Sequence, residues 1–354
     1  MEDTKINFKG QSIYIGLDVH LKSWKVCFRL DEFEHGVHTM PPSPKALSNY
    51  LRKYFPNGDY YSVYEAGYCG YWIHEELESY GIQNTIVNPL DVPTKDKEKR
   101  VKTDRIDCRK LARHLRNGEL DTIFIRDKEQ QQDRSLVRMR YTLVKKQTIC
   151  KNQIKSLLAF YGIQIEEEKI QSHWSKNFIK WIDESTKQMG SATLTFEILL
   201  NELKDIRELV STVTKQIRVL SDTDRYNVIV KLLRSIPGIS VLSAMTIITE
   251  IGDIKNFDNL DKLNGYIGLI PNEHSSGEKE IKTRMTHRGN KILKNILVEC
   301  SWMAVRKDPS LILAYKNYIK KHKSTKAIIK ITRKLVSRIR FVLINQQEYK
   351  LSVV

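Results

Sequence analysis

Four carboxylates of this sequence stand where predicted strands end or where a predicted helix begins. Asp18 and Glu65 each follow a short apolar strand, so two parallel neighbouring strands would present both side chains at one edge of a sheet. Asp104 and Asp107 are three residues apart at the start of a predicted helix and therefore share one of its faces. Taken singly, each acid is more simply a surface or capping residue, and Asp104 would merely favour the helix dipole.

Together, the four acids predict a metal site. Converging carboxylates repel one another unless cations lie between them. Ligand sets made only of oxygen suit Mg²⁺ or Mn²⁺. Two such ions, roughly 4 Å apart, stabilise the attacking and the leaving oxygen in phosphodiester transfer. The expected chemistry is therefore the cutting or joining of nucleic-acid backbones.

The positive charge of the chain is concentrated near its C-terminal end. Lys and Arg outnumber Asp and Glu by 59 to 42 overall, which gives a formal net charge of +17. Residues 281–340 alone hold seventeen Lys and Arg against two acids, Glu299 and Asp308. Dense cationic patches bind polyphosphates through the release of counterions. A merely solvated basic face is the alternative, but this density favours a nucleic-acid partner.

A second nucleic-acid signal lies in residues 232–251, LLRSIPGISVLSAMTIITEI. This stretch predicts two helices joined by a tight turn at Pro237 and Gly238, which is typical of a helix-hairpin-helix. Amide groups of such a turn, at a helix N-terminus, can hold a phosphate. An ordinary helical hairpin gives the same pattern, and contact with a DNA backbone is the favoured interpretation.

The first 125 residues must position the acids, and they alternate short strands with helices. This order indicates an α/β sheet layered with helices. Thr103 has the residue type of an N-cap for a helix that runs to Arg116. We expect the other elements as strands at 12–17, 24–30, 60–64 and 83–87, and as helices at 44–55 and 71–80.

The middle of the chain is predicted to be helical. Apolar residues from 199 to 220 recur at alternating steps of four and three, which is a heptad pattern. An earlier helix repeats apolar residues every seven positions over 136–157 and is rich in Lys and Arg. The two helices could pair within one chain or between chains, and both arrangements fit the pattern.

The whole chain, at 354 residues, is expected to form two or three domains. No run of about eighteen apolar residues is present, so we expect no membrane span. The first twelve residues lack the apolar core of a secretory signal. Five cysteines with no two close together argue against a zinc knuckle or a disulfide framework. These features predict a cytoplasmic protein.

Several stretches closely resemble the DEDD transposases of the insertion-sequence-110 family. They are IGLDVHLKSWKV, VYEAGYCGYWIHEEL, NPLDVPTKDKEKRVKTDRIDCRKLARHL, SIPGISVLSAMTIITEIGD and GYIGLIPNEHSSGEKEIKTRMTHRGNKILKNIL. The most specific pieces are KTDRIDCRKLA, and PNEHSSGEK followed by HRGNK. The resemblance covers about three-quarters of the chain, in order and at plausible spacing.

The resemblance implies a fold and a domain order. Residues 1–125 would form a RuvC-like domain of RNase H fold, 126–225 a helical coiled-coil linker, and 226–354 a mainly helical transposase domain that holds the helix-hairpin-helix. By the same likeness, the acidic tetrad falls on the four residues already chosen by position: Asp18, Glu65, Asp104 and Asp107.

The resemblance also implies a nucleophilic serine before a glycine in the C-terminal loop. In HSSG this is most naturally Ser276, with Ser275 as the second choice. A serine hydroxyl is a weak nucleophile, and metal ions on the scissile phosphate could activate it. Without the resemblance, a plain Ser-Gly surface turn would be the better interpretation. The basic residues expected to bind nucleic acid are Lys279, Lys282, Arg284, His287, Arg288 and Lys291, with Arg138, Lys145 and Lys151 of the middle helix.

Members of this family are further thought to be guided by a structured RNA that pairs with target and donor DNA. The resemblance therefore implies DNA and a guide RNA as partners. The heptad pattern from 199 to 220, together with the need to cut and join several strands, predicts a dimer or a tetramer. One alternative is a RuvC-like endonuclease that resolves branched DNA by water attack. Another is a non-catalytic nucleic-acid-binding protein with a dead nuclease fold, against which the presence of all four acids argues.

Overall fold

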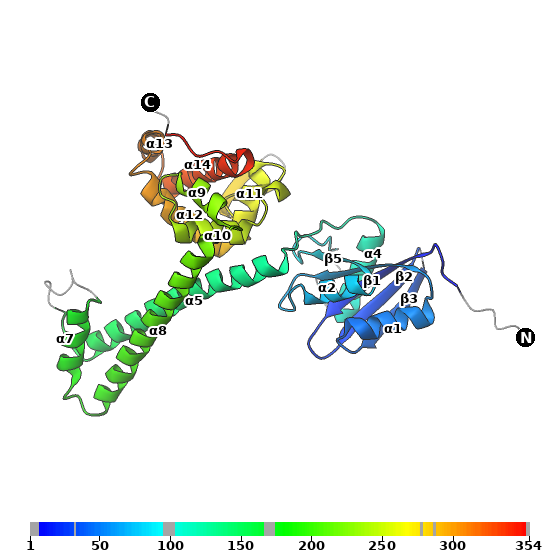
Figure 1. Cartoon of the computed structure of the whole chain (residues 1–354), viewed down its shortest axis with the longest axis horizontal. Coiled ribbons are helices and arrows are strands. Elements are labelled where there is room, and N and C mark those ends of the chain that lie inside the picture. The colour runs from blue at the N-terminus through cyan, green and yellow to red at the C-terminus, as the bar shows by residue number, and fades with distance from the viewer. Residues whose placement is uncertain are drawn as a thin grey trace, which may run out of the picture. The chain divides into compact units, whose positions relative to one another are not determined.

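The computed structural model describes residues 7–31, 33–94, 103–165, 174–276, 279–285 and 288–351, with the backbone alone described for 272–276 and 279–285. The chain divides into two compact units, Met1–Ile125 and Arg126–Val354 (Figure 1). Among the helices of these described residues, none combines the length and the apolar character that a membrane crossing requires.

The first unit is built on a mixed sheet of five strands in the order β3-β2-β1-β4-β5. β1, β4 and β5 run parallel, whereas β2 and β3 continue the sheet antiparallel to β1. Four of these strands match the predicted ones, and β3 is an additional edge strand. Their bounds are Ser12–Val19 (β1), Trp24–Leu30 (β2), Phe33–Met40 (β3), Asp59–Glu65 (β4) and Gln83–Val87 (β5).

Helices cover both faces of this sheet. α1 (Pro44–Tyr54) and α2 (Trp72–Ser79) share a core with the odd-numbered apolar residues of β1. α4 (Asp104–Arg116) packs on β1, β2 and β4 and forms separate apolar clusters with them. Because side chains alternate between the faces of a strand, Gly16 and Asp18 of β1 belong to the face that α4 covers.

The second unit begins with two long helices, α5 and α8, that lie along one another (Figure 1). The Cys150 thiol donates to the Leu199 carbonyl, while the Arg140 guanidinium donates to the Thr214 hydroxyl. Since an earlier residue of α5 meets a later residue of α8, the two helices are antiparallel. A shorter helix, α7, packs on α8. The bounds are Lys128–Phe160 (α5), Lys176–Thr186 (α7) and Ser191–Ser221 (α8).

The heptad residues of α8 pack within the chain. Leu203 and Ile206 are buried in a core that α8 shares with α5 and α7. Ile217 is buried in the core of the C-terminal helices. Of the two arrangements left open by the sequence, the structure therefore has the pairing within one chain.

The C-terminal helices form the largest core of the second unit, which also includes Val137 of α5. The sequence NEHSSGEKE is predicted to form a loop. In the structure, its described residues instead belong to the two strands of an antiparallel hairpin, β6 and β7. The bounds are Asn227–Arg234 (α9), Val241–Ile251 (α10), Ile254–Asn256 (η1), Leu260–Ile267 (α11), Pro271–Ser276 (β6), Lys279–Met285 (β7), Lys291–Ala304 (α12), Pro309–Ile319 (α13) and Ser324–Asn345 (α14).

Candidate active site

Strand pairing brings two of the four acids together. β1 and β4 are parallel, with Leu17 opposite Tyr64. Continued by one residue, this register places Asp18 beside Glu65 where both strands end. Paired residues of parallel strands point to the same face of the sheet. Both carboxylates therefore lie on the side that α4 covers.

The other two acids reach this edge because α4 can lie directly on β1. A Cβ atom at Gly16 would be 2.0 Å from the Cys108 carbonyl oxygen and 2.6 Å from the Ala112 amide nitrogen. No side chain fits into that space, so only glycine permits the approach of the two backbones. The close contact fixes the height of α4 above the strand that carries Asp18.

The first turn of α4 carries Asp104 and Asp107. The Thr103 side chain accepts a hydrogen bond from the Ile106 amide at 3.4 Å, which confirms the predicted N-cap. Residues three apart on a helix lie on the same side of it. The start of the helix therefore presents both acids in the same direction.

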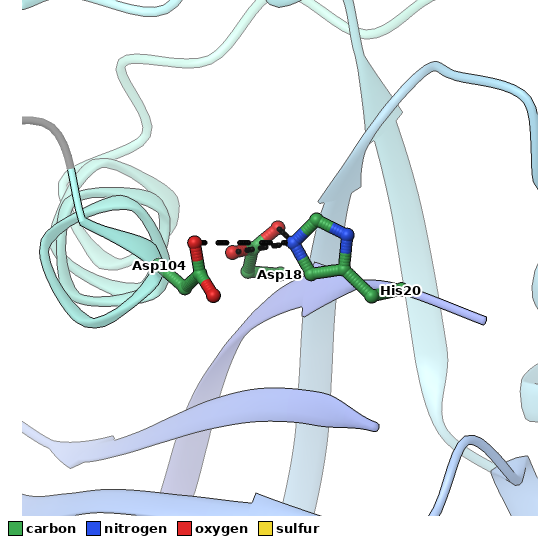
Figure 2. A group of neighbouring side chains, drawn as sticks. All are labelled: Asp18, His20 and Asp104. Carbon is green, nitrogen blue, oxygen red and sulfur yellow. Dashed lines mark hydrogen bonds and ion pairs between the residues drawn. The ribbon is translucent and has the colours of Figure 1, made fainter. Parts of the chain in front are cut away.

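The imidazole of His20 faces the carboxylates of both Asp18 and Asp104 (Figure 2). Its Nε2 atom is 3.2 Å from Oδ1 and 3.3 Å from Oδ2 of Asp18, and 4.0 Å from Oδ1 of Asp104. One ligand atom from each of the three residues falls within 4.8 Å of the other two. This half of the site is open, because the side chains of His20 and Asp104 are 48% and 57% exposed.

A lysine joins the other two acids. Lys110 Nζ is 3.3 Å from Asp107 Oδ1 and 3.9 Å from Glu65 Oε1. The Lys110 side chain is only 8% exposed, and a buried ammonium group needs anionic partners. The structure thus brings all four acids into one cluster with two halves, and each half contains one basic side chain among the residues that the structure describes.

Burial raises the pKa of Asp18 above its ordinary value, because desolvation disfavours the charged carboxylate. The charge and hydrogen bond of His20 oppose this shift, whereas the charges of Asp104 and Asp107 add to it. The Asp18 carboxylate therefore senses both acids of α4. A divalent cation placed among these groups would relieve the repulsion and favour the deprotonated form.

The chemistry of the donor set fits a divalent metal ion. Asp18 and Asp104 offer carboxylate oxygens, the ligands that Mg²⁺ and Mn²⁺ prefer in proteins. Asp107 and Glu65 offer two more carboxylates on the same side of the sheet. An ion held here would stabilise negative charge on the oxygens of a scissile phosphate.

Both basic residues of this cluster escaped the sequence-based prediction. His20 is two residues after Asp18, and Lys110 is three residues after Asp107. The second spacing places Lys110 on the same side of α4 as Asp107, and the first places His20 just beyond the end of β1, two residues after Asp18. The signal is therefore present in the sequence, but a search for metal ligands of oxygen alone passes over it.

The two candidate nucleophiles lie in β6 of the hairpin. Ser276 is opposite Lys279 and Ser275 is opposite Glu280, and Ser276 is the last residue of β6. Their backbone is described and their side chains are not. The hairpin thus gives Ser276 the position closest to its tip.

The basic residues expected near these serines fall in and after β7. Arg288 and Lys291 are both exposed, and Lys291 is the first residue of α12. His287 lies outside the described residues. Three further residues belong to β7 and are described by their backbone alone: Lys279, Lys282 and Arg284.

The basic residues expected on α5 have different surroundings. Lys145 is exposed and lies 5.7 Å from the centre of the Tyr141 ring. The Lys151 ammonium lies 5.5 Å from the centre of the Trp174 ring. Arg138 instead donates two hydrogen bonds to a buried carboxylate of the same unit, so a protein group already engages its guanidinium.

That buried carboxylate, Glu250 of α10, ties three helices together. It is fully buried and accepts hydrogen bonds from Arg134, Arg138 and Asn290. Burial alone would raise its pKa, but the two guanidinium groups outweigh this effect and lower the pKa to about 2. Asn290 is the N-cap of α12 and follows β7 closely in the chain. Glu250 therefore links the base of the serine hairpin to α5.

The predicted turn at Pro237 and Gly238 joins α9 to α10. Ser240 caps α10, and Ser243 completes a reciprocal capping box. Gly238 has a φ of +93°, and a Cβ atom there would be 2.5 Å from the Cys300 carbonyl oxygen of α12. The glycine is thus required both by the turn and by its packing on α12.

Comparison with known proteins assigns the chain to a family. A model of the DEDD transposases of the IS110 type matches residues 15–163, and a model described as the transposase IS116/IS110/IS902 family matches residues 230–316. Together these ranges cover more than half of the chain. The first model implies an RNase H-like fold for the unit that holds the acids, and a divalent metal ion in general terms.

Individual relatives of this chain are named as transposases as well. The chain is 30% identical to a putative transposase, y4qE, of Sinorhizobium fredii over 68% of this chain and 58% of the relative. It is 25% identical to the transposase for insertion sequence element IS1111A of Coxiella burnetii, over 80% of this chain and 77% of the relative. A transposase for element IS1533 of Leptospira borgpetersenii is 22% identical over 66% of this chain and 67% of the relative.

The match to the Sinorhizobium relative thus spans less than two thirds of that protein's length. The two family models, by contrast, match both units of this chain and describe the same kind of transposase. The first of them contains the whole cluster of acids, from Asp18 to Asp107. The chain therefore belongs to the IS110 family of DEDD transposases.

Proposed function

We propose that this chain is a DNA transposase that excises and inserts an insertion sequence, with Mg²⁺ or Mn²⁺ at its acids and a serine-linked DNA intermediate. The observation that carries the proposal is the cluster of Asp18, Glu65, Asp104 and Asp107, which lies in a unit matched by a DEDD transposase model. The names of the relatives, transposases for insertion sequence elements, support the same substrate.

In the proposed reaction, the Ser276 hydroxyl oxygen attacks a phosphorus atom of the DNA backbone. A bond forms between serine oxygen and phosphorus, and the bond from phosphorus to one sugar oxygen breaks. The serine gives up its proton, and the departing sugar oxygen takes one up. A sugar hydroxyl of the exchanged strand then attacks the phosphoserine, which restores a phosphodiester and the free serine.

The covalent step gives a recombinase an advantage over attack by water. The phosphodiester is stored on the protein, so strands can be exchanged and rejoined without an external source of energy. The acids would hold the ion that stabilises charge on the phosphate. The basic residues of β7 and of 281–340 would hold the flanking backbones.

We also propose that a structured RNA guides this protein to its DNA, and that it works as a dimer or a tetramer. If base pairing selects the DNA sequence, the protein needs only to hold backbones, and a net charge of +17 suits that task. Purification from cells followed by sequencing of the bound RNA tests the guide. A preparation that contains no discrete RNA would contradict it.

Recombination on a plasmid that carries the element tests the assignment of the acids. Alanine at any of the four positions should abolish both excision and insertion while the fold survives, because metal ligands act as a unit. Glu75→Gln, a change at an exposed acid of the same unit, is the matched control and should recombine normally. Near-normal recombination in two of the four alanine variants would contradict the assignment.

A further inference from the structure

The two halves of the acid cluster differ in their exposure to solvent. The half made by Asp18, Asp104 and His20 includes the two most exposed side chains of the cluster, at 48% and 57%. The half made by Glu65 and Asp107 encloses the Lys110 ammonium, whose side chain is 8% exposed. Among the described residues, an incoming cation meets only the imidazole of His20 in the first half, whereas it must compete with the Lys110 ammonium in the second. The first ion should therefore bind between Asp18 and Asp104.

The spacing of ligand atoms in the open half suits an octahedral ion. With metal–ligand bonds of about 2.1 Å, neighbouring ligand atoms are about 3.0 Å apart and opposite ones about 4.2 Å apart. His20 Nε2 lies 3.2 Å from Asp18 Oδ1 and 4.0 Å from Asp104 Oδ1. These separations lie within the range expected of atoms that bind one ion, so His20 is within reach of an ion that Asp18 and Asp104 would hold (Figure 2).

We propose that His20 is a nitrogen ligand of this ion, completed by Asp18 and Asp104, and that it makes the site prefer Mn²⁺ to Mg²⁺. The inference rests on the proposed function, since it assumes that the acids bind a divalent ion. Mg²⁺ selects oxygen ligands almost exclusively, whereas imidazole suits transition metals. A site of four carboxylates would favour the harder ion, and one imidazole among them shifts the preference.

Electron spin-echo spectroscopy of bound Mn²⁺ tests this directly, because a coordinated nitrogen modulates the echo of the metal. The full chain is loaded with less than one equivalent of Mn²⁺ in the absence of DNA. The wild-type protein should show nitrogen modulation that changes when its histidines are labelled with ¹⁵N. His20→Asn should still bind Mn²⁺ but lose the modulation. His35→Asn, a change at an exposed histidine of β3, is the matched control and should retain it.

Ion competition provides the second measurement. Because an amide oxygen replaces the imidazole nitrogen, His20→Asn should weaken Mn²⁺ binding about ten-fold or more. Its effect on Mg²⁺ should be several times smaller, because asparagine supplies an oxygen in place of the imidazole. Asp104→Asn should instead weaken both ions, because it removes a charged oxygen ligand that both use.

Different results would contradict the role of His20 and the metal site formed by the acids. Mn²⁺ that binds through Asp104 but shows no nitrogen modulation would overturn the role of His20 and leave the acid site intact. Equal weakening of Mn²⁺ and Mg²⁺ in His20→Asn would also overturn it, because His20 would then only shape the site. Mn²⁺ binding that is unchanged by alanine at both Asp18 and Asp104 would overturn the acid site as well.

Discussion

Asp18 and Asp104 share the imidazole of His20, while Glu65 and Asp107 share the ammonium group of Lys110. Four converging carboxylates repel one another, and each basic group lies close to two of them, where it can reduce this repulsion. They differ in what they permit. An imidazole nitrogen can itself bind a metal ion, whereas a lysine ammonium must be displaced before a cation takes its place.

Lys110→Met should destabilise the protein in the absence of divalent ions. The change leaves Glu65 and Asp107 without the ammonium that they share, so we expect the free energy of unfolding to fall by about 2 kcal/mol. Millimolar Mg²⁺ should recover most of this loss, because the ion can occupy the vacated half. Urea unfolding with and without Mg²⁺ measures both effects.

Lys110→Arg is the control for this experiment, because it keeps the positive charge and should be much closer to wild type in stability. A Lys110→Met protein as stable as wild type without metal would show that the lysine does not balance the acids. A loss of stability that Mg²⁺ leaves unchanged would show that the second half binds no ion.

The positions of the four acids could be predicted, because each follows from a local pattern. Asp18 ends an apolar strand, and Asp107 is one turn along a helix that begins at Thr103. The roles of His20 and Lys110 could not be predicted in the same way. His20 also contacts Asp104, and Lys110 also contacts Glu65. These acids are distant from the two basic residues in sequence and become their neighbours only when β1, β4 and α4 pack together.

The contact between β1 and α4 is the element on which the site depends. Gly16→Ala would place a methyl group 2.0 Å from the Cys108 carbonyl oxygen, so α4 must shift away from the sheet. Overpacking of this kind costs about 1–3 kcal/mol, and it would move Asp104 and Asp107 away from Asp18. We expect a lower melting temperature and a loss of recombination out of proportion to the loss of stability.

Gly67→Ala is the matched control, because its Cβ atom would meet only the Glu65 carbonyl oxygen at 3.9 Å. Divalent-ion binding should weaken in Gly16→Ala and stay near wild type in Gly67→Ala. If Gly16→Ala binds Mn²⁺ and recombines normally, the closeness of α4 to β1 does not set the geometry of the site.

The Glu250 network should make the second unit sensitive to acid. The two guanidinium groups hold the folded-state pKa at about 2, below the ordinary 4.5, so the stabilisation is complete above pH 4.5 and is lost as the pH falls toward 2. A shift of this size corresponds to about 3 kcal/mol. Glu250→Gln should therefore be much less stable than wild type at pH 7.

Urea unfolding at pH 7, 4.5 and 3 measures this effect, and the gap between wild type and Glu250→Gln should narrow as the pH falls. Glu299→Gln, a change at an exposed acid of α12, should leave the stability at each pH nearly unchanged. A gap for Glu250→Gln that is the same at all three values would contradict the role assigned to its charge.

Among the elements, those with clear periodicity matched their predictions, and the exceptions have physical causes. β3 (FEHGVHTM) is an edge strand with a single buried residue, Met40, so it lacks an apolar alternation. The β6–β7 hairpin is built from polar residues and is held by backbone pairing, which side-chain hydropathy does not report. The heptad pattern of α8 predicted pairing with the earlier basic helix but did not specify whether the two helices pair within one chain or between chains.

Over the whole molecule, charge should govern nucleic-acid binding. Four exposed lysines lie close together around the end of α13 and the start of α14, in the most basic part of the chain. Each phosphate contact contributes about 0.9 to the slope of log affinity against log salt concentration. The lysines are Lys320, Lys321, Lys323 and Lys326.

Replacing all four with Gln should weaken binding to the element's DNA and reduce that slope by up to about 3.6, if each lysine contacts one phosphate. Binding titrations at several salt concentrations measure the slope. The control changes four exposed lysines of α7 and the segment around α8, outside the basic tail: Lys176, Lys180, Lys187 and Lys204. An unchanged slope in the tail variant, or an equal drop in the control, would show that this region is not the binding surface.

At the scale of the whole molecule, composition and local charge predicted a nucleic-acid partner. How the acids and the candidate serines come together could not be predicted. The acids lie in the unit Met1–Ile125 and the candidate serines in the unit Arg126–Val354. Nothing in either local sequence pattern specifies how Ser276 and Asp107 would meet on DNA. That both act in one reaction is part of the proposed function.

Trapping of the covalent intermediate tests the central claim most directly. The protein is incubated with the element's DNA and its RNA, denatured, digested with nuclease and trypsin, and examined by mass spectrometry. Both serines fall in one tryptic peptide, LNGYIGLIPNEHSSGEK, so fragmentation can assign the modified residue. We predict a nucleotide attached to Ser276, absent in Ser276→Ala and in the Asp104→Ala variant, and present in Ser275→Ala. DNA cleavage with no adduct, or an adduct that persists in Ser276→Ala, would contradict the account.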